Sequence, residues 1–345
     1  MKKHDVFDVA IIGAGFAGLS AALVLGRYLR PVVIFDGGKT RNYITKHVHS
    51  YLGLDILSPR KFIKKAWKDV LQYGCIKVIK QEVISIEKCE QYFSVSIKKT
   101  GSSIVAKYII IASGITDIKP DIKNFSRLDW NGAWHCPHCD GLEAAGKSLI
   151  VIGNSNNSII SYAKEFLGWT NKITVFIQDN HHLNDSEKTE AKRLSINVVE
   201  NDPLIDVIDD GRKSHQVKLL SKTGKIHYAQ VLFYHIGYNI QNELAKQLGC
   251  KLDEGFIKTN EKHQTTITNV YAAGDIDTDR HYVVFAVTSG AVAAISIYED
   301  ILKQMLENWV PYLVYFMLLF FVWNSIPCEL CQIQGLIEEL SKLVG

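Results

Sequence analysis

The stretch Asp8-Val9-Ala10-Ile11-Ile12-Gly13-Ala14-Gly15-Phe16-Ala17-Gly18 decides the fold. Its first five residues predict a buried parallel strand, its glycines a tight turn, and the apolar run from Leu19 to Leu29 a helix. A second strand over residues 32–35 ends in Asp36. In this arrangement the glycines admit a pyrophosphate onto the helix N-terminus and the acid binds a ribose hydroxyl, which predicts a dinucleotide-binding site. The candidate residues of this site are Gly13, Ala14, Gly15, Phe16, Ala17, Gly18 and Asp36.

A second motif, His135-Cys136-Pro137-His138-Cys139-Asp140-Gly141, carries two cysteines at C-x-x-C spacing. Such a pair can close a small disulfide ring, in which one thiolate attacks a disulfide and the other resolves the mixed intermediate. The alternative is half of a zinc site that uses the flanking histidines. The only other C-x-x-C, Cys328 to Cys331, lies far away in an apolar tail, so we expect redox chemistry and no metal.

Two later segments each form a hydrophobic strand that ends in a turn of small residues. Residues 109–111 are followed by Ala112-Ser113-Gly114, and residues 268–273 by Gly274-Asp275. Together with the glycine turn and the C-P-H-C-D-G motif, they resemble the flavoprotein disulfide reductases. Within these, the chain is similar to the low-molecular-weight thioredoxin reductase-like group, which includes a dithiol-oxidase branch. The similarity runs from about Phe7 to about Leu302.

The resemblance implies an enzyme, a flavoprotein disulfide oxidoreductase that binds FAD. It implies that Gly274 and Asp275 hold the flavin ribityl and phosphate, and it adds Ala112 and Gly114 to the cofactor site. It also implies a homodimer.

The same resemblance implies a role for each residue of the C-x-x-C motif. Cys139 is expected beside the flavin, Cys136 is expected to meet the substrate, and Asp140 is expected to move a proton on or off the dithiol. The Asp140-Gly141 pair also reads as an ordinary turn. His135 and His138 either lower the pKa of the cysteines or are spectators of the reaction.

The order of the signals predicts an α/β fold with two Rossmann-like, three-layer dinucleotide-binding domains, the second inserted into the first. The FAD-binding domain is expected over residues 1–117 and 247–302, and the insert, which carries the C-x-x-C, over 118–246. An apolar helical tail follows over 303–345. The insert repeats the nucleotide pattern, with a strand at 147–152, a turn at 153–158, a helix at 159–167 and a strand at 173–177.

The second nucleotide turn departs from the family's pattern. Ser155 stands where a glycine would allow close approach of the pyrophosphate. Gln178 and Asp179 stand where NADPH-dependent relatives carry arginines for the 2′-phosphate. The cofactor prediction is therefore FAD, with NADPH disfavoured and the choice between NADH and NADPH open.

This departure leaves the direction of the reaction open. A thioredoxin reductase-like enzyme passes electrons through FAD and the dithiol to a protein disulfide, whereas a dithiol oxidase returns them from a dithiol to oxygen or a quinone. Arg41-Asn42, the segment 47–50 and the altered second turn resemble the oxidase branch, but Asp140 resembles the reductases. A redox sensor without turnover is a third reading. The expected substrate is a thioredoxin-like protein or a small dithiol or disulfide.

Composition limits the partners and the compartment. The chain has 345 residues, is 47% hydrophobic and has a net charge of +3, so it can bury two cores, and nucleic acid is not an expected partner. Seven cysteines and no signal peptide favour the cytoplasm. Cys75, Cys89 and Cys250 are expected to be ordinary buried or half-buried residues.

The tail carries a separate signal. No charged residue occurs from Trp309 to Cys328, and a helix of about 20 apolar residues spans a bilayer core. Trp309 and Trp323 lie near the ends of the most apolar stretch, as interfacial anchors would. We expect membrane contact through 309–328; the alternative is a helix packed against the core or a partner subunit.

Overall fold

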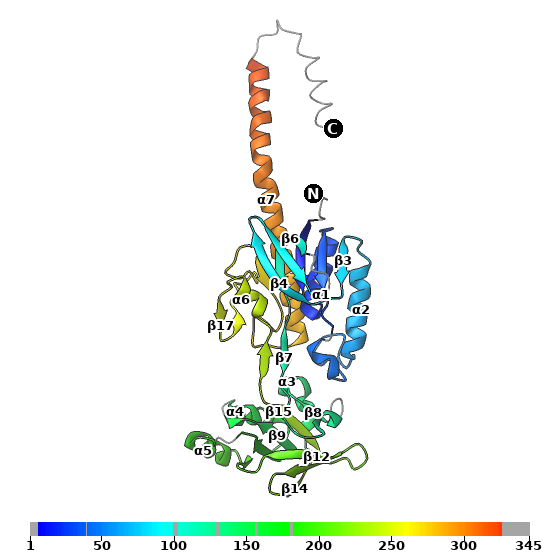
Figure 1. Cartoon of the computed structure of the whole chain (residues 1–345), viewed down its shortest axis with the longest axis vertical. Coiled ribbons are helices and arrows are strands. Elements are labelled where there is room, and N and C mark those ends of the chain that lie inside the picture. The colour runs from blue at the N-terminus through cyan, green and yellow to red at the C-terminus, as the bar shows by residue number, and fades with distance from the viewer. Residues whose placement is uncertain are drawn as a thin grey trace. The chain divides into compact units, whose positions relative to one another are not determined.

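The computed structural model describes residues 6–38, 40–98, 103–128, 132–155, 158–179 and 182–325. The chain divides into two compact units, Met1–Ser296 and Ile297–Gly345. The first unit contains both predicted nucleotide patterns, and its α/β architecture confirms the predicted fold class (Figure 1).

The first sheet has the strand order β3-β2-β1-β6-β5-β4, and β19 pairs with β6. The strands β1, β2, β3, β6 and β19 pair in parallel, whereas β4 and β5 are antiparallel to their neighbours. The strands are β1 (Phe7–Ile12), β2 (Val32–Phe35), β3 (Ile76–Ile79), β4 (Val83–Cys89), β5 (Tyr92–Ile97), β6 (Ser103–Ile111) and β19 (Val270–Ala272).

The carboxyl ends of three of these strands meet at one edge of the sheet. Ile12 is paired with Ile111, and Ile111 with Ala272. Because the strands are parallel, the segments that follow them emerge side by side. This register brings together the glycine turn, the Ala112–Gly114 turn and the Gly274–Asp275 turn.

Two helices follow the strands of this sheet. Helix α1 (Phe16–Arg27) begins directly after Gly15, three residues before the expected start, and it ends before Leu29, whose φ of 55° is left-handed. Helix α2 is Pro59–Leu71, and a short 3-10 turn, η1 (Arg41–Ile44), precedes it. A Cβ atom on Gly18 would overlap the carbonyl group of Gly13, so the turn and the helix can pack closely only with glycine there.

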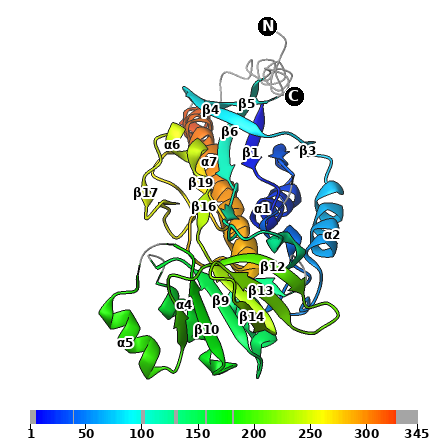
Figure 2. The ribbon, with the colours of Figure 1, turned by 60° about the horizontal axis from the view of Figure 1, so that its bottom comes forward.

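The inserted segment builds a parallel sheet of order β11-β10-β9-β15-β8 and an antiparallel sheet of order β12-β13-β14 (Figure 2). Its strands are β8 (Ala133–Trp134), β9 (Leu149–Gly153), β10 (Ile173–Ile177), β11 (Asn197–Val199), β12 (Leu204–Asp210), β13 (Val217–Ser221), β14 (Ile226–Ala229) and β15 (Val231–His235). Its helices are α4 (Ile159–Lys164), which continues as the 3-10 turn η5 (Glu165–Gly168), and α5 (Asp185–Arg193).

The chain passes between the two sheet systems through two short strands. Strand β7 (Ile115–Asp117) directly follows the first sheet, and β16 (Tyr238–Ile240) directly follows the inserted sheet; they pair antiparallel, with Asp117 opposite Tyr238. The remaining elements are η2 (Phe125–Leu128), α3 (Pro137–Asp140), η3 (Gly141–Ala144), α6 (Glu243–Gln247), β17 (Leu252–Asp253) and β18 (Phe256–Ile257).

The C-terminal apolar stretch is part of a longer helix than predicted. Helix α7 runs over Val283–Ser325, so it starts within the first unit and not at the expected tail boundary near 303. By length and composition alone, its part Val283–Trp309 is apolar enough to cross a membrane, with a mean hydropathy of 1.4. Cys328 and Cys331 lie outside the described residues.

Candidate active site

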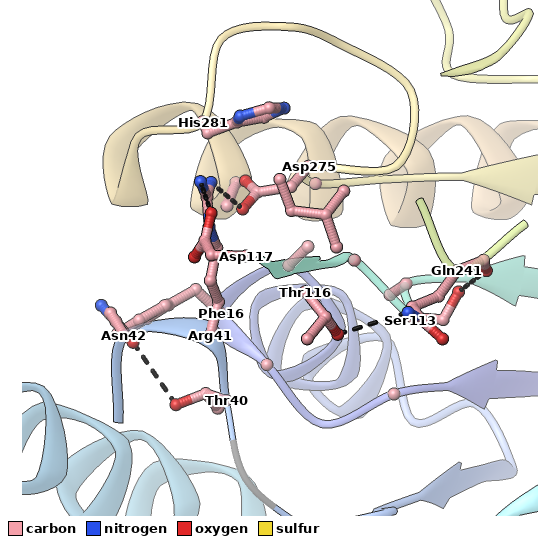
Figure 3. Close-up of a pocket in the computed structure, with 18 of the residues that line it drawn as sticks. Phe16, Thr40, Arg41, Asn42, Ser113, Thr116, Asp117, Gln241, Asp275 and His281 are labelled. Carbon is pink, nitrogen blue, oxygen red and sulfur yellow. Dashed lines mark hydrogen bonds and ion pairs between the residues drawn. The ribbon is translucent and has the colours of Figure 1, made fainter. Parts of the chain in front are cut away.

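The three turns at the edge of the first sheet line a cavity of about 920 Å³. Figure 3 shows part of its wall, with Phe16 from the start of α1 and Asp275 from the turn after β19. Cysteines of the C-x-x-C motif line the same cavity. The predicted site residues that line it are Gly13, Ala14, Gly15, Phe16, Ala17, Ala112, Gly114, Cys136, Cys139, Asp140, Gly274 and Asp275.

Two predicted cofactor residues, Gly18 and Asp36, are not among the described residues that line the cavity. Gly18 lies beneath the glycine turn, against Gly13. The Asp36 carboxylate accepts a hydrogen bond from the N–H of Gly38 at 2.9 Å, and the cavity wall is formed there by Gly37 and Gly38. Asp36 therefore shapes this loop in the structure.

The start of α1 fits the phosphates of a dinucleotide. Its N-cap is Gly15, which offers no side-chain cap, and the first turn holds no acidic residue. A Cβ atom built on Gly15 meets no atom within 4 Å, so the backbone of Gly15 borders open space at the start of the helix. Unsatisfied N–H groups and the helix dipole favour an anion at this position.

The redox pair stands at the start of α3. Cys136 and Cys139 form a disulfide, and the N–H of Cys139 donates to Cys136 Sγ at 3.1 Å. Gly141 has ordinary right-handed helical geometry and does not form the left-handed turn that an Asp-Gly pair allows. Packing requires a glycine at position 141, because a Cβ atom there would lie 2.6 Å from the ring of Trp169.

Asp140 lies beside the disulfide in the cavity wall and is only 8% exposed. Burial raises its pKa to about 7, and the nearby charge of Glu143 contributes to the rise. The carboxyl group is therefore present in both protonation states near neutral pH, as a proton donor and acceptor must be.

An ion cluster that the sequence did not single out lies in the same wall (Figure 3). The guanidinium of Arg41 forms a two-pronged hydrogen bond with Asp117, at 2.8 and 2.6 Å, and pairs with Asp275 at 3.1 Å. His135 Nε2 lies 3.5 Å from Asp117 Oδ2. The sequence marks Arg41 only through the Arg41-Asn42 pair, and no local pattern marks Asp117, because its partner is 76 positions away.

Burial and charge act against each other in this cluster. Burial alone would raise the pKa of Asp117, but the hydrogen bonds and the charge of Arg41 lower it overall. Burial lowers the pKa of His135 and of His281, and the charge of Arg41 lowers both further. The two imidazoles are therefore neutral at pH 7, whereas Arg41 and Asp117 are charged.

In the second nucleotide turn, the hydrogen-bond donors of Ser155 are paired with another side chain of the protein. The N–H of Ser155 donates to the two carboxylate oxygens of Asp179 at 3.3 and 3.2 Å, and the Ser155 hydroxyl donates at 3.1 Å. The side-chain amide of Gln178 pairs with both backbone groups of Leu204. Asn156, Asn157, Asn180 and His181 lie outside the described residues.

Other histidines and cysteines vary in position. His47 and His49 line the cavity, whereas His138 is 58% exposed and pairs with Glu165 at 3.0 Å. Cys250 is buried and Cys75 half-buried, but Cys89 is exposed, contrary to expectation. In the described part of the chain, no three His, Cys, Asp or Glu side chains gather as metal ligands would.

The chain is similar to known proteins over most of its length. Residues 7–294 match the family of pyridine nucleotide-disulphide oxidoreductases. Thioredoxin reductase sirT of Leptosphaeria maculans is 30% identical, over 84% of this chain and 92% of its own. The crystal structure of HlmI, 25% identical, superposes with a TM-score of 0.82 over 91% of this chain and 98% of its own. The crystal structure of an oxidoreductase from Agrobacterium tumefaciens is 28% identical and superposes with a TM-score of 0.76. The match covers 86% of this chain and 99% of the other.

These comparisons confirm the predicted enzyme class and the predicted cofactor, FAD, with the choice of nicotinamide nucleotide open. When bound, FAD supplies the electron-accepting and electron-donating chemistry that the side chains lack. The chain belongs to the pyridine nucleotide-disulphide oxidoreductases, as a thioredoxin reductase-like flavoprotein of the low-molecular-weight group.

Proposed function

We propose that the protein exchanges electrons between FAD, the Cys136–Cys139 pair and a thiol or disulfide substrate. The observation that carries the proposal is that the disulfide lines the same cavity as the glycine turn and the Gly274–Asp275 turn. A redox pair and a dinucleotide site that share one cavity can pass electrons without a further carrier.

The two thiols have different roles in this proposal. In the reducing direction, the Cys136 thiolate attacks the substrate disulfide and releases one substrate thiol; Cys139 then attacks Cys136 and releases the second. The disulfide forms again, and two electrons and two protons have passed to the substrate. Oxidation of a dithiol runs the same steps backwards. Asp140 gives or takes the proton at the dithiol.

The cofactor site and the domains are part of the same proposal. The FAD-binding domain comprises residues 1–117 and 247–302, and 118–246 form the insert. The crossing of the chain through β7 and β16 supports a boundary near 117 and another shortly after 240. The glycine turn holds the FAD pyrophosphate, and Gly274 and Asp275 hold the ribityl and phosphate. We also propose that the protein forms a homodimer. Its substrate would be a thioredoxin-like protein or a small dithiol or disulfide.

A second candidate is a dithiol oxidase that passes electrons to oxygen or a quinone. The bonds between Ser155 and Asp179 favour it, because they use the N–H that a nicotinamide nucleotide's pyrophosphate would need. A substrate dithiol would then be the source of electrons.

We further propose that the catalytic unit is cytoplasmic and that the C-terminal helix anchors it. The uncharged sequence from Trp309 to Cys328 and the helical conformation up to Ser325 support this. A membrane location would also make quinones available as acceptors.

Substitution of each cysteine tests the thiol roles. Cys136→Ser and Cys139→Ser should each abolish turnover while FAD stays bound, because neither thiol alone completes the exchange. Cys136→Ser should show a long-wavelength absorbance band from the Cys139 thiolate beside the flavin. Cys89→Ser, at an exposed position, is the matched control. A band in Cys139→Ser instead would reverse the roles, and normal turnover in both variants would end the proposal.

The acid-base role of Asp140 predicts a pH dependence. The carboxyl is neutral below its pKa of about 7 and accepts a proton above it, so flavin reduction by dithiothreitol should gain from Asp140 as the pH rises. The ratio of parent to Asp140→Asn rates should rise through pH 7 and level off at about 10²-fold. Glu143→Gln should move the rise to lower pH, because the Glu143 charge raises the Asp140 pKa. A ratio that is flat between pH 5 and 9 contradicts this role.

Anaerobic flavin reduction tests the electron donor. NADPH should reduce the flavin at least about tenfold more slowly than dithiothreitol, and NADH no more slowly than NADPH, since Asp179 repels a 2′-phosphate. The double variant Ser155→Gly, Asp179→Ala should bring the rates of flavin reduction by NADPH and NADH closer to the rate with dithiothreitol, because the backbone N–H of the second turn is no longer bonded to a carboxylate. Fast reduction of the unmodified protein by NADPH would instead favour the thioredoxin reductase direction.

Fractionation tests the anchor. The full chain should sediment with membranes and need detergent for release, whereas a chain that ends at Lys303 should stay in the supernatant. Leu318→Lys, which places a charge within the uncharged stretch at a cost of about 2.5–3.5 kcal/mol, should weaken sedimentation, and Leu302→Lys should not. If the full chain stays soluble without detergent, the anchor is wrong.

A further inference from the structure

We propose that Arg41 and Asp117 form a clamp that positions the redox loop, residues 135–140, at the cavity. The clamp adds two positioning residues to the proposed function, and it rests on that function only for the identity of the thiol beside the flavin.

The clamp joins parts of the chain that are far apart in sequence. Arg41 lies in η1 after β2, Asp117 is the last residue of β7, and Asp275 follows β19. Both oxygens of Asp117 accept hydrogen bonds from Arg41, a fork geometry that an arginine and a carboxylate share. The side chains of Arg41 and Asp117 are only 17% and 15% exposed, so solvent screens this pair weakly.

The clamp reaches the redox loop through His135. Asp117 Oδ2 lies 3.5 Å from His135 Nε2, and the hydroxyl of Tyr162 donates to the His135 carbonyl oxygen at 3.1 Å. The backbone of His135 is thereby held by a hydrogen bond, its neutral ring lies against the Asp117 carboxylate, and the next residue is Cys136. Displacement of Asp117 would remove the contact with the ring.

The position of Asp117 explains why its effect should reach the loop. Strand β7 is one of the two strands through which the chain enters and leaves the inserted segment. Arg41 ties the end of β7 to η1, which belongs to the first sheet system. The clamp therefore restrains the end of β7, the strand that leads into the inserted segment and its redox loop. In Asp117→Asn, an amide NH₂ would face the guanidinium donors, which breaks the fork with little change in volume.

Hydrogen exchange of the FAD-loaded full chain tests the clamp. The N–H groups of Cys139 and Asp140 donate to the Cys136 carbonyl, so their exchange rates report how well the loop is held. In Asp117→Asn these amides should exchange about tenfold faster than in the parent. His135→Gln, which leaves Arg41 and Asp117 paired, should have a smaller effect in the same direction.

Asp8→Asn is the matched control. Asp8 is also a weakly exposed carboxylate, at 12%, and pairs with Lys107 at 3.0 Å and Arg30 at 3.7 Å, but it lies in β1. The Asp8→Asn variant should leave the amide hydrogen-exchange rates of the redox loop unchanged. The clamp is wrong if neither Asp117→Asn nor His135→Gln accelerates exchange, or if Asp8→Asn does so equally.

A spectroscopic measurement separates the clamp from the proposed thiol roles. In the Cys136→Ser background, Asp117→Asn should reduce the long-wavelength band by at least about half, because the band depends on close contact of thiolate and flavin. An undiminished band would contradict the clamp. If Cys136→Ser alone shows no band, the thiol assignment fails, and the exchange rates still decide whether the clamp exists.

Discussion

The active site depends on the parallel pairing of β1, β6 and β19. Their last residues, Ile12, Ile111 and Ala272, are in register, so the three following turns leave the sheet at one edge. The turns touch through their backbones: a Cβ atom on Gly13, which has φ 111°, would overlap the carbonyl of Ala112. Small residues therefore close the floor of the cavity and leave its volume to a ligand.

The two nucleotide turns share one strand-turn-helix architecture but differ in what lies in front of their backbone N–H groups. At the first turn, Gly15 leaves the N-terminus of α1 open. At the second, Asp179 accepts the hydrogen bonds that a phosphate would accept from Ser155. A pyrophosphate would have to displace this internal carboxylate against charge repulsion. One turn therefore fits a cofactor, whereas the other is satisfied by the protein.

Local patterns predicted the parts of this site that depend on neighbouring residues. The glycine turn and the C-x-x-C disulfide follow from short motifs, and both line the cavity. The pairing of Arg41 with Asp117 could not be predicted, because it depends on the approach of η1 and β7 in space. The Asp140-Gly141 pair is also typical of a turn, but the structure requires glycine at 141 because of the ring of Trp169, which lies 28 positions further along the chain. The start of α7 at Val283 could not be predicted from the uncharged stretch, because that stretch begins only at Trp309 and the helix before it contains charged residues.

The chemistry at the disulfide does not by itself favour one direction. A buried carboxyl group with a pKa of about 7 is available as an acid and as a base at neutral pH, so Asp140 can serve reduction and oxidation of a substrate alike. Thiol-disulfide exchange is equally reversible at Cys136 and Cys139. The direction must therefore be determined by the partner that delivers electrons. The proposed oxidase direction rests on the second nucleotide turn, where the Asp179 carboxylate accepts the hydrogen bonds of Ser155 that a phosphate would otherwise accept.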